Sequence, residues 1–199
     1  MKEKRNIMVD IETIGKVQDA TIFQIAAASF DVKTGAIFDT INLKLDVRSV
    51  EDFNADGDTL LWWLNTDKEL LTKLLNEGNL IEPTFYRLFS EWLTDQMLNA
   101  GGDVELAMWG NGISFDIVRL RNKYEKMDAP FIINFRNEYD VRTIVELAAD
   151  YTGKSINELK AMATNESETK HDALDDVRYQ VRLVAMCYNM LMSNEVSPT

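Results

Sequence analysis

Apolar residues recur at every second position of the segment 6–14, which is the period of a β-strand. Asp10 and Glu12 occupy intervening positions, so both carboxylates leave the same face of the predicted strand. The segments 21–32 and 36–45 are also strand-like, and the short Lys-Thr-Gly sequence between them predicts a hairpin. Three antiparallel strands are therefore expected at the start of the chain.

Helical periodicity dominates the rest of the chain. Apolar residues three and four positions apart predict helices at 59–65, 67–78, 82–99, from a Ser114 cap to Lys126, at 140–153, after a capping box at 155–158, and at 173–192. Two further strands are predicted at 104–110 and 130–135. The polar segment 164–170 is expected to be poorly ordered without a substrate, and the tail after Ser193 to fray.

This order of elements favours an α/β fold with one mixed sheet covered by helices. The length of 199 residues suits a single domain, 1–199, with its core at about 5–192. No apolar window is long enough to span a membrane, so no membrane contact is expected. Asp10 and Glu12 interrupt the apolar run near the N-terminus, which makes it a poor signal peptide. The single cysteine, Cys187, excludes an internal disulfide and fits a reducing cytoplasm, where we expect it to be a buried thiol.

The chain is acidic, with 21 Lys and Arg against 33 Asp and Glu and a net charge of −12. This balance argues against a protein that coats nucleic acid with a basic face. The argument weakens if carboxylates hold divalent cations, because a bound ion inverts the local electrostatics. It also weakens if the protein grips only the end of a strand.

Asp10, Glu12 and Asp116 are candidate metal ligands. Two carboxylates about 6–7 Å apart along one strand can flank a pair of metal ions, and Mg²⁺ and Mn²⁺ prefer such oxygen ligands. Asp116 falls in the first turn of a helix that follows a strand, where ligand sites are common. The alternatives are a solvated charged strand face for the pair and a helix-capping role for Asp116.

His171 is the only histidine of the chain and is a candidate general base. The alternative is a solvated loop histidine ahead of a helix. Asp172, Asp175 and Asp176 follow it, and any of them could simply decorate the helix N-terminus. Periodicity places Asp175 and Asp176 at comparable angles from the apolar stripe, so it does not choose between them.

In this order the segments resemble the 3′–5′ exonucleases named DEDD after four acidic residues, which include the proofreading subunit of bacterial DNA polymerase III and ribonuclease T. The segment "VDIETIG" matches their D-x-E strand, "NGISFD" matches their second motif, and His171 with Asp176 matches H-x-x-x-x-D of the histidine branch. The segments "WWL", "MWGNGISFDIVRLRN" and "DVRTIVELA" look like a narrower group. That group contains phage and prophage exonucleases of the exonuclease VIII type and bacterial exoribonuclease-like proteins.

The resemblance implies a ribonuclease-H-like fold, with a five-stranded sheet of order 3-2-1-4-5 and helices on both faces. It implies that Asp10, Glu12, Asp116 and Asp176 bind two Mg²⁺ or Mn²⁺ ions, and that His171 helps to activate the attacking water. The expected substrate is the 3′ end of single-stranded DNA or RNA, and the expected products are nucleoside 5′-monophosphates. Thr13 and Ile14 are expected to meet the terminal nucleotide, mostly through backbone and apolar contact, and Asn111 is expected to bind the substrate.

Other readings remain open from the sequence. The same fold could serve an endonuclease, or a module that binds a nucleic-acid end or a partner protein without cutting. Either Trp62 or Trp63 could stack on a base, and core packing is expected for at least one of them. Four cations could steer phosphates or form a solvated face: Arg119, Arg121, Lys123 and Arg136. The resemblance leaves room for a homodimer and places the protein in a bacterial or phage-infected cytoplasm.

Overall fold

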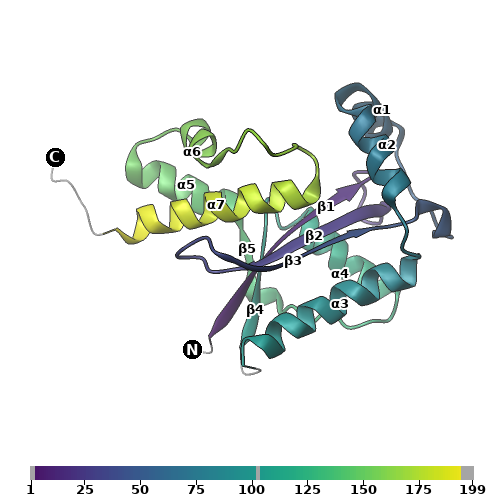
Figure 1. Cartoon of the computed structure of the whole chain (residues 1–199), viewed down its shortest axis with the longest axis horizontal. Coiled ribbons are helices and arrows are strands. Elements are labelled where there is room, and N and C mark those ends of the chain that lie inside the picture. The colour runs from purple at the N-terminus through teal and green to yellow at the C-terminus, as the bar shows by residue number, and fades with distance from the viewer. Residues whose placement is uncertain (1–2, 102–103, 194–199) are drawn as a thin grey trace.

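The computed structural model describes residues 3–101 and 104–193, and its centre is a five-stranded sheet (Figure 1). The strands run in the order β3-β2-β1-β4-β5. They are β1 (Lys4–Thr13), β2 (Ile22–Phe30), β3 (Ile37–Lys44), β4 (Glu105–Gly110) and β5 (Glu138–Asp140). Strand β2 is antiparallel to both β1 and β3, whereas β4 is parallel to β1 and β5 is parallel to β4. The predicted α/β class and strand order are confirmed.

Helices cover both faces of the sheet (Figure 1). They are α1 (Gly57–Thr66), α2 (Lys68–Glu77), α3 (Glu82–Asn99), α4 (Asp116–Lys126), α5 (Val141–Thr152), α6 (Ile156–Ala163) and α7 (Ala173–Met192), with 3-10 turns at Val47–Ser49 and Phe135–Asn137. Helices α3 and α4 lie on one side, α5 to α7 on the other, and α1 and α2 stand beyond one end of the sheet. Within the described residues, no helix is long and apolar enough to cross a membrane. The tail predicted to fray, 194–199, lies outside the described residues.

The alternating pattern of β1 divides its side chains between two cores. Ile7, Val9 and Ile11 pack against α3 and α4. Met8 packs on the opposite face in the core that contains Val177 and Val181 of α7. Because side chains alternate along a strand, Asp10 and Glu12 share the face of Met8 and point toward α7.

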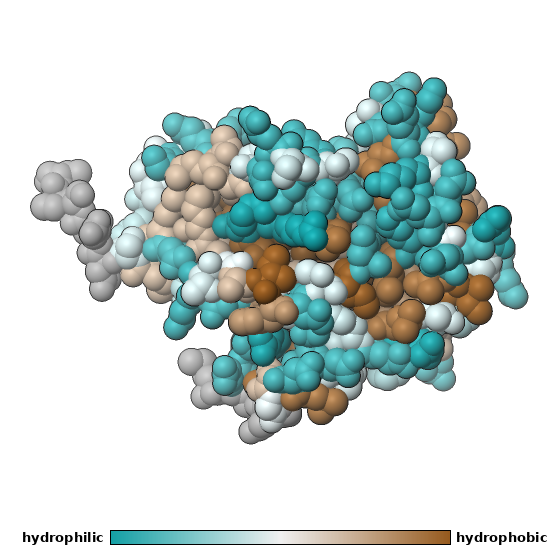
Figure 2. Space-filling model, in the orientation of Figure 1, coloured by the Kyte–Doolittle hydropathy of each residue, from teal (hydrophilic) through white to brown (hydrophobic). Residues whose placement is uncertain are grey.

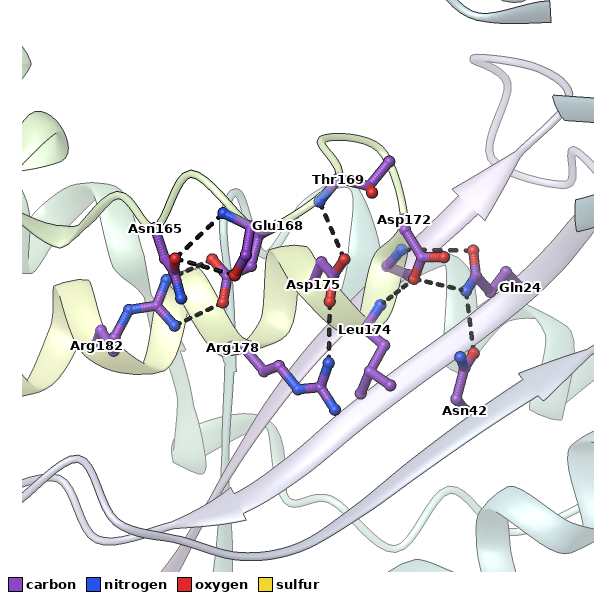
Figure 3. Close-up of polar contacts among 12 residues, drawn as sticks. Gln24, Asn42, Asn165, Glu168, Thr169, Asp172, Leu174, Asp175, Arg178 and Arg182 are labelled. Atoms are coloured by element: carbon purple, nitrogen blue, oxygen red, sulfur yellow. Dashed lines mark hydrogen bonds and ion pairs between the residues drawn. The ribbon is translucent and has the colours of Figure 1, made fainter. Parts of the chain in front are cut away.

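The start of α7 is fixed to the sheet by Gln24 of β2 (Figure 3). Its amide nitrogen donates to Asp172, the N-cap of α7, at 3.4 Å, and to Asn42 of β3 at 3.0 Å. Its amide oxygen accepts the backbone N–H of Ala173 at 3.4 Å. This network places the N-terminal turn of α7, and the residues just before it, beside the carboxylates of β1.

The strand predicted at 130–135 is wrong. The fifth strand is the shorter β5, which pairs with β4 through Met108–Glu138 to Gly110–Asp140. In the segment 130–135, Ile133 is buried in the core under α4 and Phe131 packs on the ring of Tyr124 at 5.3 Å, while Ile132 and Phe135 are exposed. The segment is therefore irregular, and its apolar residues Phe131 and Ile133 pack into the core although its backbone does not join the sheet.

The predicted Ser114 cap is also wrong. Helix α4 begins at Asp116, its N-cap is Phe115, and no side chain caps it. The turn before α4 is held instead by Asp140 at the end of β5, whose carboxylate accepts the N–H of Ile113 at 3.1 Å. This partner is 27 residues away in sequence, so local spacing could not indicate it.

Candidate active site

Asp116 reaches the end of β1 because β1 and β4 are parallel neighbours. Met8 pairs with Trp109, so Asp10 lies level with the turn that follows Gly110. The backbone of Ile11 lowers the pKa of the Asp116 carboxyl and so offsets part of the rise caused by burial, which places this carboxyl beside β1. A side chain added at Gly110 would come within 3.3 Å of the same carboxylate. Because Gly110 has no side chain, Asp116 can lie against the end of the sheet at which Asp10 is located.

Asp10 is held from α7 by Gln180, whose amide nitrogen donates to Oδ1 of Asp10 at 2.8 Å. Gln180 is buried within the apolar stripe of α7, and its amide oxygen has no partner among the described residues. Sequence reasoning missed this residue. The available signal was a polar residue four positions after Asp176, on the same helix face and between Val177 and Val181.

Glu12, His171 and Asp176 form the tightest cluster of the site. One potential ligand atom from each lies within 4.8 Å of those of the other two. The backbone N–H of His171 donates to Oδ2 of Asp176 at 3.1 Å. His171 has a φ of +66°, in the left-handed region that few residues other than glycine adopt. This backbone turn brings the histidine back over the first turn of α7.

The two tryptophans of α1 divide their roles as expected, since one is buried and the other exposed. Trp63 is buried, and its indole N–H donates to the backbone oxygen of Thr13 at 3.2 Å. Trp62 is 43% exposed, and its ring meets the His171 ring edge to face at 5.1 Å. The predicted core role of one tryptophan is confirmed. The other forms a wall beside the histidine, which the sequence did not indicate.

The surroundings of the acidic residues raise their pKa values. Burial is the main cause of the raised pKa of Asp10 and of Glu12, and repulsion from neighbouring carboxylates adds to it. Burial also raises the pKa of Asp176, and it raises the pKa of Asp116 to about 7. Among residues 3–101 and 104–193, no ion pair joins any of these four to Lys or Arg. Four acidic groups thus share a partly buried space without such an ion pair, and the charges of Arg119 and Arg142 offset only part of the rise in the pKa of Asp116.

This donor set fits a hard divalent cation. Carboxylate oxygens are the ligands that Mg²⁺ and Mn²⁺ prefer, and a cation would relieve the repulsion that raises the pKa values. Glu12 and Asp176 lie close enough together to share one ion, with His171 beside them. Asp10 and Asp116 adjoin this cluster, since the charges of Asp116 and Asp176 both act on Asp10.

Asp175 and Asp176 are adjacent but have different surroundings. Asp175 accepts the N–H of Thr169 at 3.0 Å and pairs with Arg178 at 3.0 Å on the outer side of α7 (Figure 3). Asp176 instead faces Glu12 and His171. Asp172 caps α7 by accepting the N–H of Leu174 at 3.1 Å. The structure therefore places Asp176 in the cluster and gives the other two aspartates structural contacts.

The residues expected to bind the substrate lie in two different environments. Thr13 is buried and its hydroxyl donates to the carbonyl of Gly15 at 2.8 Å. Ile14 is buried in the small core beneath α1 and α2, with Phe23 and Trp63. Asn111 is exposed and lines a groove that also contains His171. Only Asn111 presents its side chain to solvent.

The four candidate cations are not a single solvated face. Arg119 is buried, and it donates to the carbonyl of Phe115 at 3.0 Å and to that of Lys16. It therefore ties the start of α4 to the loop that follows Glu12. Arg121 pairs with Glu138, and Lys123 is buried, whereas Arg136 is exposed.

Comparison with known proteins gives one family match. A family model described as "3'-5' exoribonuclease Rv2179c-like domain" matches residues 5–188. It falls in the exoribonuclease-like part of the group expected from the sequence. No curated protein matches the chain by sequence.

Several solved nuclease structures share the fold. The nuclease domain of 3'hExo, a DEDDh family member bound to rAMP, is 12% identical with a TM-score of 0.62, over 92% of this chain and 91% of that one. S. pombe Pop2p in its Mg²⁺- and Mn²⁺-bound form is 15% identical with a TM-score of 0.59, over 92% and 82%. The E. coli ExoI–ssDNA complex is 17% identical with a TM-score of 0.65, over 94% of this chain and 41% of that one. At these identities the similarity establishes the ribonuclease-H-like fold.

Proposed function

The chain belongs to the family of 3'-5' exoribonuclease Rv2179c-like domains, and from this membership we propose that it shortens single-stranded RNA from the 3′ end and releases nucleoside 5′-monophosphates. The observation that carries the proposal is the cluster of Glu12, His171 and Asp176, within 4.8 Å of one another and beside Asp10 and Asp116. Binding alone would not require a histidine within this cluster. A structure of similar fold holds rAMP, which is the kind of product proposed.

Asp10, Glu12, Asp116 and Asp176 are proposed to hold two divalent cations, Mg²⁺ or Mn²⁺. Such ions, when bound, stabilise the charge that develops on the phosphodiester and ease deprotonation of the attacking water. S. pombe Pop2p, of similar fold, is described in a form bound to both metals. The raised pKa values support the assignment, because burial and mutual repulsion outweigh the charges that the described residues supply to the four groups, and a bound cation would add the missing compensation.

The contribution of His171 is to take a proton from the water that attacks the phosphorus. Its position is set by three contacts: its backbone N–H donates to Asp176, and the rings of Trp62 and Trp63 lie at 5.1 and 6.2 Å. Asp176 is therefore proposed to act both as a ligand and as the anchor of the base. Gln180 is a positioning residue, because it donates to Asp10 and fixes the orientation of that carboxylate.

The terminal nucleotide is proposed to lie beside Thr13, Ile14 and Trp62. The pairing of β1 with β2 shifts register between Glu12 and Thr13, so the backbone after Glu12 leaves the regular ladder. The side chains of Thr13 and Ile14 are buried, so contact there involves the backbone. Trp62 offers an exposed ring on which a base can stack.

The test uses 5′-labelled single-stranded RNA and DNA of equal sequence, each with Mg²⁺, with Mn²⁺ and with chelator. We expect a ladder that shortens from the 3′ end on RNA, no cleavage in chelator, and none by the Asp10→Asn variant. A circular single-stranded RNA should stay intact. Internal cuts or cleavage of the circle would identify an endonuclease, and binding without cleavage by the wild-type protein would identify a non-cutting module.

A further inference from the structure

A groove leads away from the catalytic cluster on the side of α5 and α6. It consists of two adjoining cavities, of about 470 and 250 Å³, which share Asn111, Lys160 and Tyr179 in their walls. The larger cavity includes His171 and Asp176. The smaller one extends to Arg142 at the start of α5. A nucleic-acid strand held at the cluster could therefore continue over Tyr179 toward Arg142 without leaving the protein surface.

The charged side chains of this groove differ in whether they form ion pairs. Glu168 pairs with Arg182 and Asp175 pairs with Arg178, so two carboxylates of the larger cavity are already neutralised (Figure 3). Arg142 and Lys160, by contrast, form no ion pair among the described residues. Glu146 lines the smaller cavity beside them. Lys170, in the wall of the larger cavity, also forms no ion pair among these residues, so the groove offers three such cations in a chain whose net charge is −12.

Arg142 is directed toward this groove by its backbone and by its neighbour Gly112. Its N–H donates to the capping carboxylate of Asp140 at 2.8 Å. Its guanidinium lies over Gly112, 2.8 Å from where a side chain of that residue would begin, and Gly112 has a φ of +110°. Any larger residue at 112 would be strained and would displace the guanidinium. The turn that leads to Asp116 therefore also seats Arg142.

The groove has walls that suit bases as well as phosphates. Tyr179 of α7 is half-buried at the junction of the two cavities, where its ring can stack. The smaller cavity is flanked by Ile156 and Val145, and Asn111 supplies an exposed amide. Figure 2 shows one exterior face of the protein, on which hydrophilic and hydrophobic residues are interleaved. Because the net charge of the chain is −12, recognition of a strand is expected in a defined groove rather than over a broad basic face.

We propose that this groove binds the nucleotides that precede the cleaved one, with Lys160 and Arg142 contacting their phosphates and Tyr179 stacking on a base. The inference rests on the proposed function, since it concerns the part of the same site that would hold the RNA upstream of the cleaved bond. The terminal nucleotide would occupy the side of Thr13 and Trp62, and the rest of the strand would leave past Asn111. Cleavage should then favour substrates long enough to fill the groove.

The test compares two substrates. One is a single-stranded RNA of about ten nucleotides, and the other is the p-nitrophenyl ester of a nucleoside 5′-monophosphate, which has no preceding nucleotide. Lys160→Ala should raise KM for the RNA several-fold and leave hydrolysis of the ester unchanged. Arg142→Ala should raise KM for the RNA by a larger factor than KM for the ester, because the charge of Arg142 also acts on Asp116. Lys33→Ala, on the β2–β3 hairpin, also removes one positive charge, but outside the groove. It should change neither KM for the RNA nor hydrolysis of the ester.

Binding of the same RNA is measured by fluorescence anisotropy in the Asp10→Asn background over a range of salt concentrations. Each groove variant should reduce the slope of log K against log salt by about 0.7, the value for one lost phosphate contact on a single strand. Unchanged KM and unchanged slope in both groove variants would overturn the proposal, as would an equal loss on RNA and ester. A wild-type protein that cleaves neither substrate would refute the proposed function instead, and the anisotropy slopes would still decide the groove.

Discussion

Two groups of aspartates in this molecule show how the same side chain serves structure or chemistry. One group caps helices: Asp46, Asp56, Asp67, Asp140 and Asp172 each accept a backbone N–H at a helix start. The side chain of Arg48 and then its backbone N–H lower the pKa of Asp46, and the backbone N–H groups of Thr59 and Lys16 lower the pKa of Asp56. The other group is the cluster of Asp10, Asp116 and Asp176, where burial raises the pKa of each carboxyl.

The two groups of carboxylates differ in whether their surroundings in the protein stabilise the ionised form. A capping carboxylate receives its compensation from the fold, so it stabilises the native state when ionised. The clustered carboxylates lose hydration and repel one another, so their ionised forms destabilise the native state until a cation arrives. Carboxylates held in that condition indicate a site rather than a structural feature.

The sharpest test of this contrast is the adjacent pair Asp175 and Asp176. Asp176→Asn keeps an acceptor for the N–H of His171 but removes a charge from the cluster, so we expect activity on RNA to fall about 1,000-fold or more, as loss of several kcal/mol of metal stabilisation implies. Asp175→Asn keeps an acceptor for Thr169 and should lower activity less than about threefold, since that residue lies outside the cluster. Initial rates on 5′-labelled RNA measure both. The reverse order of effects would move the ligand assignment one residue along α7.

A second test uses the pH dependence of stability without metal. The folded pKa of Asp116 is raised to about 7 from 3.8, so its protonated form favours the native state below pH 4 and this contribution is lost as pH rises through 7. Between pH 5 and 8, wild-type protein in chelator should lose roughly 2 to 3 kcal/mol of unfolding free energy relative to Asp116→Asn. Urea unfolding at each pH gives the comparison. If the unfolding free energies of the two proteins change with pH in parallel, ionisation of Asp116 does not destabilise the native state.

The smallest expected effect concerns a cap. Asp67 caps α2 by accepting the N–H of Leu70 at 2.8 Å, far along the chain from the cluster. Asp67→Ala should cost about 1 kcal/mol of stability and leave activity unchanged, while Asp67→Asn, which keeps an acceptor, should cost much less. Thermal unfolding and RNA cleavage rates of both variants test this. A loss of activity at constant stability would mean that α2 contributes to the site.

The sequence was sufficient for the parts of the molecule that depend on local patterns. The alternation at 6–14 placed Asp10 and Glu12 on one face, and the hairpin and the long helices followed from periodicity. The strand expected at 130–135 is wrong because Phe131 and Ile133 insert into the core while the backbone of this segment does not pair with β4. A local pattern reports which side chains are buried, and it does not report whether the backbone joins a sheet.

The candidate site depended on more than local pattern. Spacing left Asp175 and Asp176 equivalent, and the family resemblance pointed to Asp176. Gln180, Asp140 and Trp62 act through contacts with residues 27 to 170 positions away, so no window of sequence could show which residues they contact. The groove at Arg142 and Lys160 likewise exists only once α5, α6 and α7 are packed together.

The central claim is that the clustered carboxylates are held for divalent cations. Calorimetric titration of Mn²⁺ into metal-free protein at pH 6.5, in two buffers of different ionisation enthalpy, measures binding and proton release together. We predict binding that releases protons, because carboxyl groups with raised pKa values must ionise to become ligands, and we predict that Asp10→Asn weakens both signals. Absence of binding by the wild-type protein, or binding without proton release, would contradict the account.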